Sequence, residues 1–147
     1  MLRSLIACCM LLGALTVHAE IIDIENAELA SMSASGVPVI DIRTAPEWAE
    51  TGVVPGSRLL TYFDARGNAD PAAWLEKVKA FAKPGDPVIV ICRSGNRTKA
   101  VSQFLSQQAG YAKVYNVKYG IRDWIKEKRP LTPGAEAMAS CRQANAC

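Results

Sequence analysis

Histidine is almost absent from this chain. The only histidine among its 147 residues is His18, which lies in an N-terminal segment that we expect to be removed. The remaining chain then cannot form a Ser-His-Asp triad, a Cys-His pair or a metal site with a histidine ligand. Any nucleophile in the mature protein must therefore be activated by electrostatics and hydrogen bonds rather than by a neighbouring imidazole.

Cysteine is also scarce, and its spacing excludes two further kinds of site. Beyond Cys8 and Cys9, the chain has only Cys92, Cys141 and Cys147, which contain neither a Cys-x-x-Cys redox pair nor a set of zinc ligands. We therefore predict no metal and no cofactor. In an oxidising compartment we expect Cys141 and Cys147 to form a local disulfide. The alternative is that one of them approaches Cys92 as a resolving thiol.

The chain has no large excess of charge of one sign. It carries 17 Lys and Arg residues and 14 Asp and Glu residues, for a formal net charge of +3, without the basic stripe that nucleic-acid binding needs. Half of the residues are hydrophobic, which at this length is enough for one domain with a buried core. We therefore predict a single domain with no nucleic-acid partner.

The first 19 residues have the pattern of a signal peptide. Arg3 supplies a positive charge, Leu5 to Leu15 form a short apolar run, and Val17-His18-Ala19 ends in the small residue typical of a cleavage site. The apolar run is shorter than the roughly 20 residues that span a bilayer, so no membrane contact is expected after cleavage. We expect cleavage after Ala19 and export to an oxidising compartment, the bacterial periplasm.

Beyond this segment, strands and helices alternate. The patterns predict strands over 21–24, 37–42, 58–61, 88–91 and 114–116. They predict helices over 26–33 with Asn26 as the cap, over 46–50, from Pro71 to before Pro84, over 98–108 and over 121–128. The alternation indicates an α/β fold in three layers, with a mainly parallel central sheet flanked by helices.

A single cysteine follows the most apolar of these strands. Val88 to Ile91 are four β-branched residues, and directly after them come Cys92 and a short loop that contains Arg93, Gly95 and Arg97. The helical pattern that follows places this loop at a helix N-terminus, where free N–H groups, the helix dipole and two arginines favour negative charge. The setting predicts a reactive thiolate at Cys92.

One family has a loop of this kind. The active-site loop of the rhodanese family of sulfurtransferases reads close to Cys-Arg-x-Gly-x-Arg-Ser/Thr, and the chain resembles it at every position of Cys92-Arg93-Ser94-Gly95-Asn96-Arg97-Thr98. Three other segments are similar to motifs of the family: Val39 to Trp48, Gly52 to Ser57 and Val114 to Trp124. The resemblance implies a rhodanese-like domain over 20–133, followed by a tail over 134–147.

Two positions depart from the family pattern. Val53 stands where the family usually has histidine, and Tyr119 stands where it commonly has the first of two glycines. Both positions lie outside the cysteine loop, so they concern the geometry of neighbouring turns more than the chemistry.

The resemblance implies sulfur transfer through a persulfide on Cys92. The thiolate would take a sulfane sulfur from thiosulfate or a similar small anionic donor and pass it to cyanide or a thiol acceptor. Backbone N–H groups of the loop from Ser94 to Thr98, which includes Gly95 and Asn96, would stabilise the persulfide, and Arg93 and Arg97 would hold the donor. The sequence specifies neither the physiological donor and acceptor nor the oligomeric state.

Two other functions stay open. The second is phosphatase or arsenate-reductase chemistry, because phosphatases of the cell-division-cycle type resemble rhodaneses in fold. The active-site loop of those phosphatases reads His-Cys-x-x-x-x-x-Arg. Here Ile91 precedes the cysteine, and Arg97 comes one residue early, so that Thr98 stands at the place of the arginine. A shorter loop suits a sulfur atom better than a tetrahedral phosphate. The third function is a non-catalytic binding module, which the retained cysteine and arginines disfavour.

Several other side chains are expected to be structural. We predict an ion pair between Arg43 and Glu47 that positions the first loop. A polar loop of Asp64, Arg66 and Asn68 is expected to be solvated and could border the active site. Packing roles are expected for the three tryptophans, Trp48, Trp74 and Trp124.

Overall fold

The computed structural model describes residues 19–147, so the expected signal peptide lies, except for Ala19, outside the described residues. Every strand and helix expected from the pattern is present, with ends shifted by a few residues. In chain order the elements are β1 (Glu20–Ile24), α1 (Asn26–Ala34), β2 (Val39–Asp41), α2 (Ala45–Thr51), β3 (Arg58–Leu59), α3 (Pro71–Lys79), β4 (Val88–Ile91), α4 (Asn96–Gln103) with a π-helical continuation η1 (Phe104–Gln108), β5 (Lys113–Val117), α5 (Gly120–Lys126) and α6 (Gly134–Gln143).

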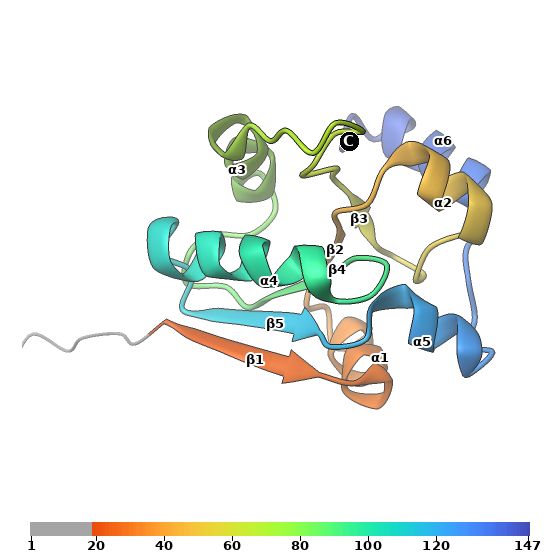
Figure 1. Cartoon of the computed structure of the whole chain (residues 1–147), viewed down its shortest axis with the longest axis horizontal. Coiled ribbons are helices and arrows are strands. Elements are labelled where there is room, and N and C mark those ends of the chain that lie inside the picture. Colours follow the sequence, from red (N-terminus) through yellow and green to blue (C-terminus); the bar gives the residue numbers. More distant parts are fainter. Residues whose placement is uncertain (1–18) are drawn as a thin grey trace, which may run out of the picture.

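The strands form one sheet in the order β1-β5-β4-β2-β3 (Figure 1). All of its pairings are parallel, because a helix follows each strand and returns the chain to the same edge of the sheet. β4 is the central strand, and all of its residues are buried. The residue after β4 therefore emerges in the middle of the carboxyl edge, where ligands bind in such sheets.

Helices cover both faces of the sheet, as the expected three-layer fold requires. On one face Val90 of β4 packs with Val78 of α3 and Val101 of α4. On the other face Ile89 of β4 packs with residues of α1 and α5, among them Leu29. The three tryptophans are buried, as predicted: Trp48, Trp74 and Trp124. None of the helices in the described part of the chain is long and apolar enough to cross a membrane.

The predicted ion pair between Arg43 and Glu47 is wrong. Arg43 pairs instead with Asp41, with 2.7 Å between Nη2 and Oδ2, and both side chains are at most 1% exposed. The same guanidinium donates to Thr51 Oγ1 at 2.8 Å and to the Gly52 carbonyl at 3.0 Å. Because α2 begins after Arg43, this side chain has no helical register with Glu47. It joins the end of β2 to the end of α2.

Asn26 does not cap α1 as expected. Glu25 is the N-cap residue, and it forms a reciprocal capping box with Glu28. This leaves the Asn26 side chain free, and its Nδ2 donates to Asp123 Oδ2 at 3.1 Å. The Asn26 amide therefore links the start of α1 to α5 instead of capping the N-terminus of α1.

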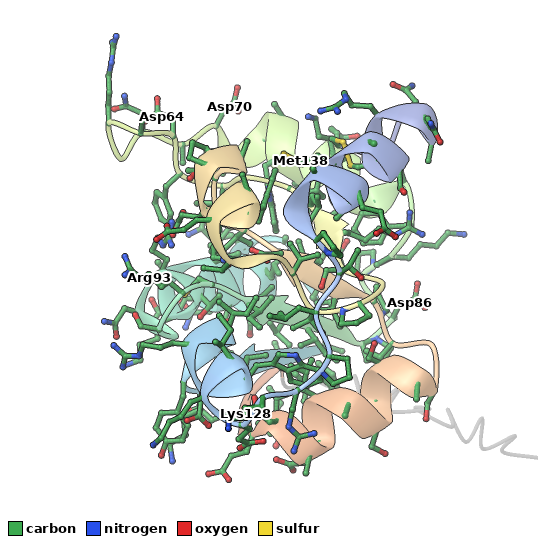
Figure 2. The ribbon with its side chains drawn as sticks, turned by 90° about the vertical axis from the view of Figure 1, so that its right-hand side faces the viewer. Asp64, Asp70, Asp86, Arg93, Lys128 and Met138 are labelled. Atoms are coloured by element: carbon green, nitrogen blue, oxygen red, sulfur yellow. A yellow bond between two sulfur atoms is a disulfide. The ribbon has the colours of Figure 1, made fainter. Side chains whose placement is uncertain are left out.

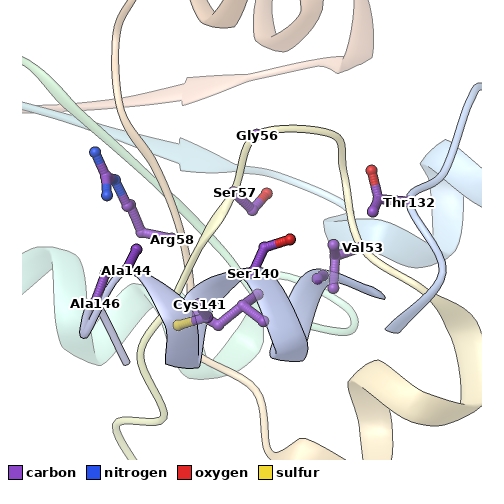
Figure 3. Close-up of a pocket in the computed structure, with 11 residues that line it drawn as sticks. Val53, Gly56, Ser57, Arg58, Thr132, Ser140, Cys141, Ala144 and Ala146 are labelled. Carbon is purple, nitrogen blue, oxygen red and sulfur yellow. The ribbon is translucent and has the colours of Figure 1, made fainter. Parts of the chain in front are cut away.

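The tail over 134–147 forms a helix that the sequence pattern does not predict. α6 packs against α2 and β3 through a cluster that includes Trp48, Leu59 and Cys141. Cys141 is joined to Cys147 by a disulfide. A hollow of about 380 Å³ lies between α6 and the segment 53–59, and no residue of the Cys92 loop lines it. Figure 3 shows the side chains around it. The tail therefore extends the packing at β3 without entering that loop.

Removing Arg43 should destabilise the protein strongly. We expect Arg43→Ala to lower the free energy of unfolding by about 3–5 kcal/mol, because Asp41 is left buried without its partner. Urea denaturation measures the change. Lys79→Ala, which breaks an exposed pair with Glu76, is the control and should cost less than about 1 kcal/mol. Similar losses in the two variants would contradict the role given to Arg43.

Candidate active site

Cys92 lies directly after β4, in the middle of the carboxyl edge of the sheet. Its side chain is 1% exposed and belongs to the apolar cluster on the α3 and α4 face. It is the free cysteine within residues 19–147. Because so little water reaches the sulfur, the polar groups of the adjoining loop determine how well a negative charge is stabilised there.

Two groups of this loop contact the Cys92 sulfur. The Gly95 N–H donates to Sγ at 3.2 Å, and the Thr98 hydroxyl oxygen lies 3.6 Å from Sγ. The Thr98 hydroxyl is also within 3.0 Å of the Gly95 carbonyl, to which it donates. Neither tail cysteine is among these contacts. The loop therefore directs one backbone N–H at the sulfur at the start of α4, where the helix dipole adds a positive field. Because the Thr98 hydroxyl proton is donated to Gly95, the Thr98 oxygen can only accept from the Cys92 thiol.

Gly95 gives the loop its shape. It is the N-cap residue of α4 and has a left-handed backbone, with φ of 85°. A Cβ atom at this position would lie 2.1 Å from the carbonyl oxygen of Lys118. Both the conformation and the close approach require glycine. This left-handed conformation points the Gly95 N–H at the sulfur.

A turn that sequence reasoning did not assign to the site holds the loop from the other side. The Ile121 N–H donates to the Cys92 carbonyl at 2.9 Å, and the Arg122 N–H donates to the Arg93 carbonyl at 3.1 Å. Gly120 has φ of 63°, and a Cβ there would lie 2.5 Å from both carbonyl oxygens. In the sequence, the sign of this contact was Gly120 at the start of the helix after β5. Because β5 is the parallel neighbour of β4, that glycine had to lie beside the Cys92 loop.

The two departures from the family pattern are accommodated in nearby turns. Tyr119 has φ of −107°, which any residue adopts, and its side chain is 44% exposed. Val53 is buried, and its backbone exchanges hydrogen bonds with Thr132 at 3.0 and 2.9 Å. Neither position disturbs the contacts of the Cys92 sulfur.

Arg97 forms an ion pair with Glu47 of α2. Nη2 of Arg97 lies 2.5 Å from Glu47 Oε1 and Nη1 lies 2.9 Å from Oε2, so the pair is bidentate. The two side chains are 31% and 22% exposed. The pKa of Arg97 is raised, chiefly by the hydrogen bonds with Glu47, which outweigh the opposite effect of burial. The cation predicted to hold the donor therefore already has a protein partner.

Burial alone would raise the pKa of Glu47, but its hydrogen bonds outweigh this effect. Arg97 and the backbone N–H and hydroxyl of Thr44 all donate to the carboxylate, and they lower its pKa from 4.5 to about 2. Thr44 and Glu47 also form the capping box of α2. The carboxylate is therefore ionised at any physiological pH.

The other predicted loop residues lie at or near the surface. Arg93 and Asn96 are exposed and Ser94 is half-buried; Figure 2 shows Arg93 at the surface on the same side of the molecule as Asp64. A hollow of about 540 Å³ is lined by Phe63, Asp64, Ala65, Gly67, Asn96 and Arg97. The polar loop around Asp64 therefore borders the cysteine loop.

This arrangement suits a sulfur nucleophile that carries negative charge in its intermediate. It supplies a buried cysteine, a backbone N–H aimed at its sulfur, a helix N-terminus and a fixed arginine at the rim. Residues 19–147 contain no cluster of His, Cys, Asp or Glu side chains that could hold a metal ion.

Comparison with known proteins identifies relatives over most of the chain. Residues 25–127 match the family described as "Rhodanese-like domain". Thiosulfate sulfurtransferase 18 of Arabidopsis thaliana is 27% identical over 122 residues, covering 80% of this chain and 88% of the plant protein. A sulfurtransferase of Allochromatium vinosum is 30% identical over 111 residues, covering 75% of this chain and 92% of that protein. Among solved structures, a rhodanese-related protein of Thermoplasma volcanium matches with a TM-score of 0.57 and 28% identity. The match covers 76% of this chain and 98% of that protein.

The Glu47–Arg97 pair should make stability depend on pH in the acid range. Because the pKa of Glu47 in the folded protein is about 2 rather than 4.5, the pair stabilises the fold fully above about pH 4.5. That contribution is lost as the pH falls towards 2. The difference in free energy of unfolding between wild type and Glu47→Gln should therefore shrink below pH 4.5. A difference that stays constant from pH 7 to pH 2.5 would contradict this account; the exposed Glu76→Gln is the control.

Proposed function

Because the chain belongs to the rhodanese-like domain family, we propose that it is a sulfurtransferase that acts through a persulfide on Cys92. The donor is thiosulfate or a similar small anionic sulfur compound, and the acceptor is cyanide or a thiol. The observation that carries this proposal is the Gly95 N–H that donates to the buried Cys92 sulfur. It places a hydrogen-bond donor where a sulfur anion must be stabilised.

In the first half of the reaction, the Cys92 thiolate attacks the outer sulfur of thiosulfate. The new S–S bond forms as the bond to the sulfonate sulfur breaks, and sulfite leaves with the electron pair. Cys92 then carries a persulfide anion. The N–H groups at the start of α4 stabilise this anion, and the rim arginines Arg93 and Arg97 attract the doubly charged donor.

In the second half, the acceptor attacks the outer sulfur of the persulfide. With cyanide, a C–S bond forms, the S–S bond breaks, thiocyanate leaves and the thiolate returns. A hollow lined by Asn96 and Arg97 lies next to the Cys92 loop, and it is the side from which an acceptor would approach. No step needs a general base, which is consistent with a mature chain that lacks histidine.

Loop length favours sulfur transfer over phosphate chemistry. The sixth position after the cysteine is Thr98, which is fully buried and lies against the sulfur. An arginine would be needed there to hold a phosphate. The intact nucleophile also argues against a binding module without catalysis.

Replacing the nucleophile tests the proposal. The purified mature protein should transfer sulfur from thiosulfate to cyanide, measured as thiocyanate, and should leave an aryl phosphate intact. Cys92→Ser should lose at least about 10³-fold of this activity because no histidine can activate a hydroxyl. Its unfolding curve should match that of the wild type. Hydrolysis of the aryl phosphate that depends on Cys92, or substantial thiocyanate formation by Cys92→Ser, would overturn the assignment.

We also propose that the protein is exported and that its mature form begins at Glu20. Glu20 is the first residue of β1, and its N–H donates to the Ala112 carbonyl at 2.9 Å. Cleavage after Ala19 would therefore leave the sheet whole. The intact mass of protein recovered from the periplasm of an expressing bacterium should correspond to residues 20–147. A mass that retains residues 1–19 would contradict the proposal.

A further inference from the structure

The two arginines of the Cys92 loop are held in different ways. The Arg93 side chain is exposed and, within the described residues, makes no side-chain hydrogen bond. Both terminal nitrogens of Arg97 are bound by Glu47. A free arginine samples many rotamers, and a bidentate carboxylate removes most of that freedom. Only Arg97 is therefore presented to a ligand in one orientation.

Glu47 is itself fixed by its surroundings. Its Oε2 accepts from both the N–H and the hydroxyl of Thr44, each at 3.0 Å. The far end of the helix that carries Glu47 is anchored by Arg43, which donates to Thr51 and Gly52. Since Arg43 is paired with a buried aspartate, rigid contacts lead from the sheet to the Arg97 guanidinium.

The pair leaves Arg97 able to bind an anion. A guanidinium has five N–H donors, and the two bonds to Glu47 use two of them. Arg97 also lines the hollow beside the Cys92 loop. The remaining N–H groups are thus available to a donor that enters there. Glu47 cannot contact an anionic donor favourably, since its own charge would repel it.

We propose that Glu47 is a positioning residue for sulfur transfer: it orients the Arg97 guanidinium toward the anionic donor, so that donor capture depends on a carboxylate that does not touch the donor. This inference rests on the proposed function. It assigns α2, which contributes no group to the sulfur, a part in recognising the substrate.

The steady-state kinetics of Glu47→Gln with thiosulfate and cyanide test the proposal. Glutamine keeps the shape of the side chain but cannot form the charged bidentate pair. We expect kcat/KM for thiosulfate to fall about tenfold, which corresponds to about 1.4 kcal/mol of transition-state stabilisation. We expect kcat/KM for cyanide to change by less than about threefold, because persulfide discharge does not use the orientation of Arg97.

Two further variants separate positioning from a loss of folded protein. In an Arg97→Lys background, which keeps the charge without the planar fork, Glu47→Gln should have little further effect on the thiosulfate constant. Glu76→Gln, on the exposed face of α3, should leave both constants unchanged. Additive effects of Glu47→Gln and Arg97→Lys would show that Glu47 does not act through Arg97.

Each other outcome has a defined meaning. An equal fall in both constants for Glu47→Gln would show a purely structural role and overturn the proposal. An unchanged or higher kcat/KM for thiosulfate in Glu47→Gln would also overturn the proposal. Glu47 would then have no part in donor capture, or would compete with the donor for Arg97. A wild-type protein without activity on thiosulfate would instead overturn the proposed function itself.

Discussion

Backbone hydrogen bonds hold the loop that carries Cys92 against the turn between β5 and α5, and the geometry at the sulfur depends on that contact. The carbonyls of Cys92 and Arg93 accept from the first N–H groups after Gly120. In the reverse direction, Gly95 lies against the Lys118 carbonyl with no room for a Cβ. The Gly95 N–H can face the sulfur because both backbones approach this closely.

Ion pairs place the remaining parts of the site around this contact. The buried pair of Asp41 and Arg43 fixes α2 at the carboxyl edge of the sheet, and α2 in turn brings Glu47 to Arg97. A buried ion pair contributes little net stability compared with apolar packing of the same volume, but here Arg43 also ties the end of β2 to Thr51 and Gly52 at the end of α2. In this protein the arrangement carries a charged side chain to the rim of a site formed by another element.

The fold and the position of Cys92 directly after the central strand could be predicted from the sequence because their signals are local. Four β-branched residues before Cys92 specify a buried central strand, and the loop motif spans consecutive residues.

The partners of Arg43 and Glu47 could not be predicted, because they depend on where α2 begins and on which elements become neighbours. α6 was missed although Ala137, Met138 and Cys141 stand at helical spacing, because the helix is short and alanines such as the exposed Ala135 leave little contrast between its packed and its exposed side. Gly120 was visible as a turn residue, but its place against Cys92 follows only from the pairing of β4 with β5.

Cys92 is the residue proposed to carry the transferred sulfur, and peptide mapping by mass spectrometry tests this most directly. Wild-type protein mixed with thiosulfate and freed of excess donor should contain one additional sulfur atom, on the peptide that includes Cys92. Cyanide should remove that sulfur and release thiocyanate. The peptides with Cys141 and Cys147 should stay linked to each other and unmodified throughout. Additional sulfur on a tail cysteine, a disulfide between Cys92 and the tail, or no persulfide at Cys92 in a protein that still turns over would contradict the account.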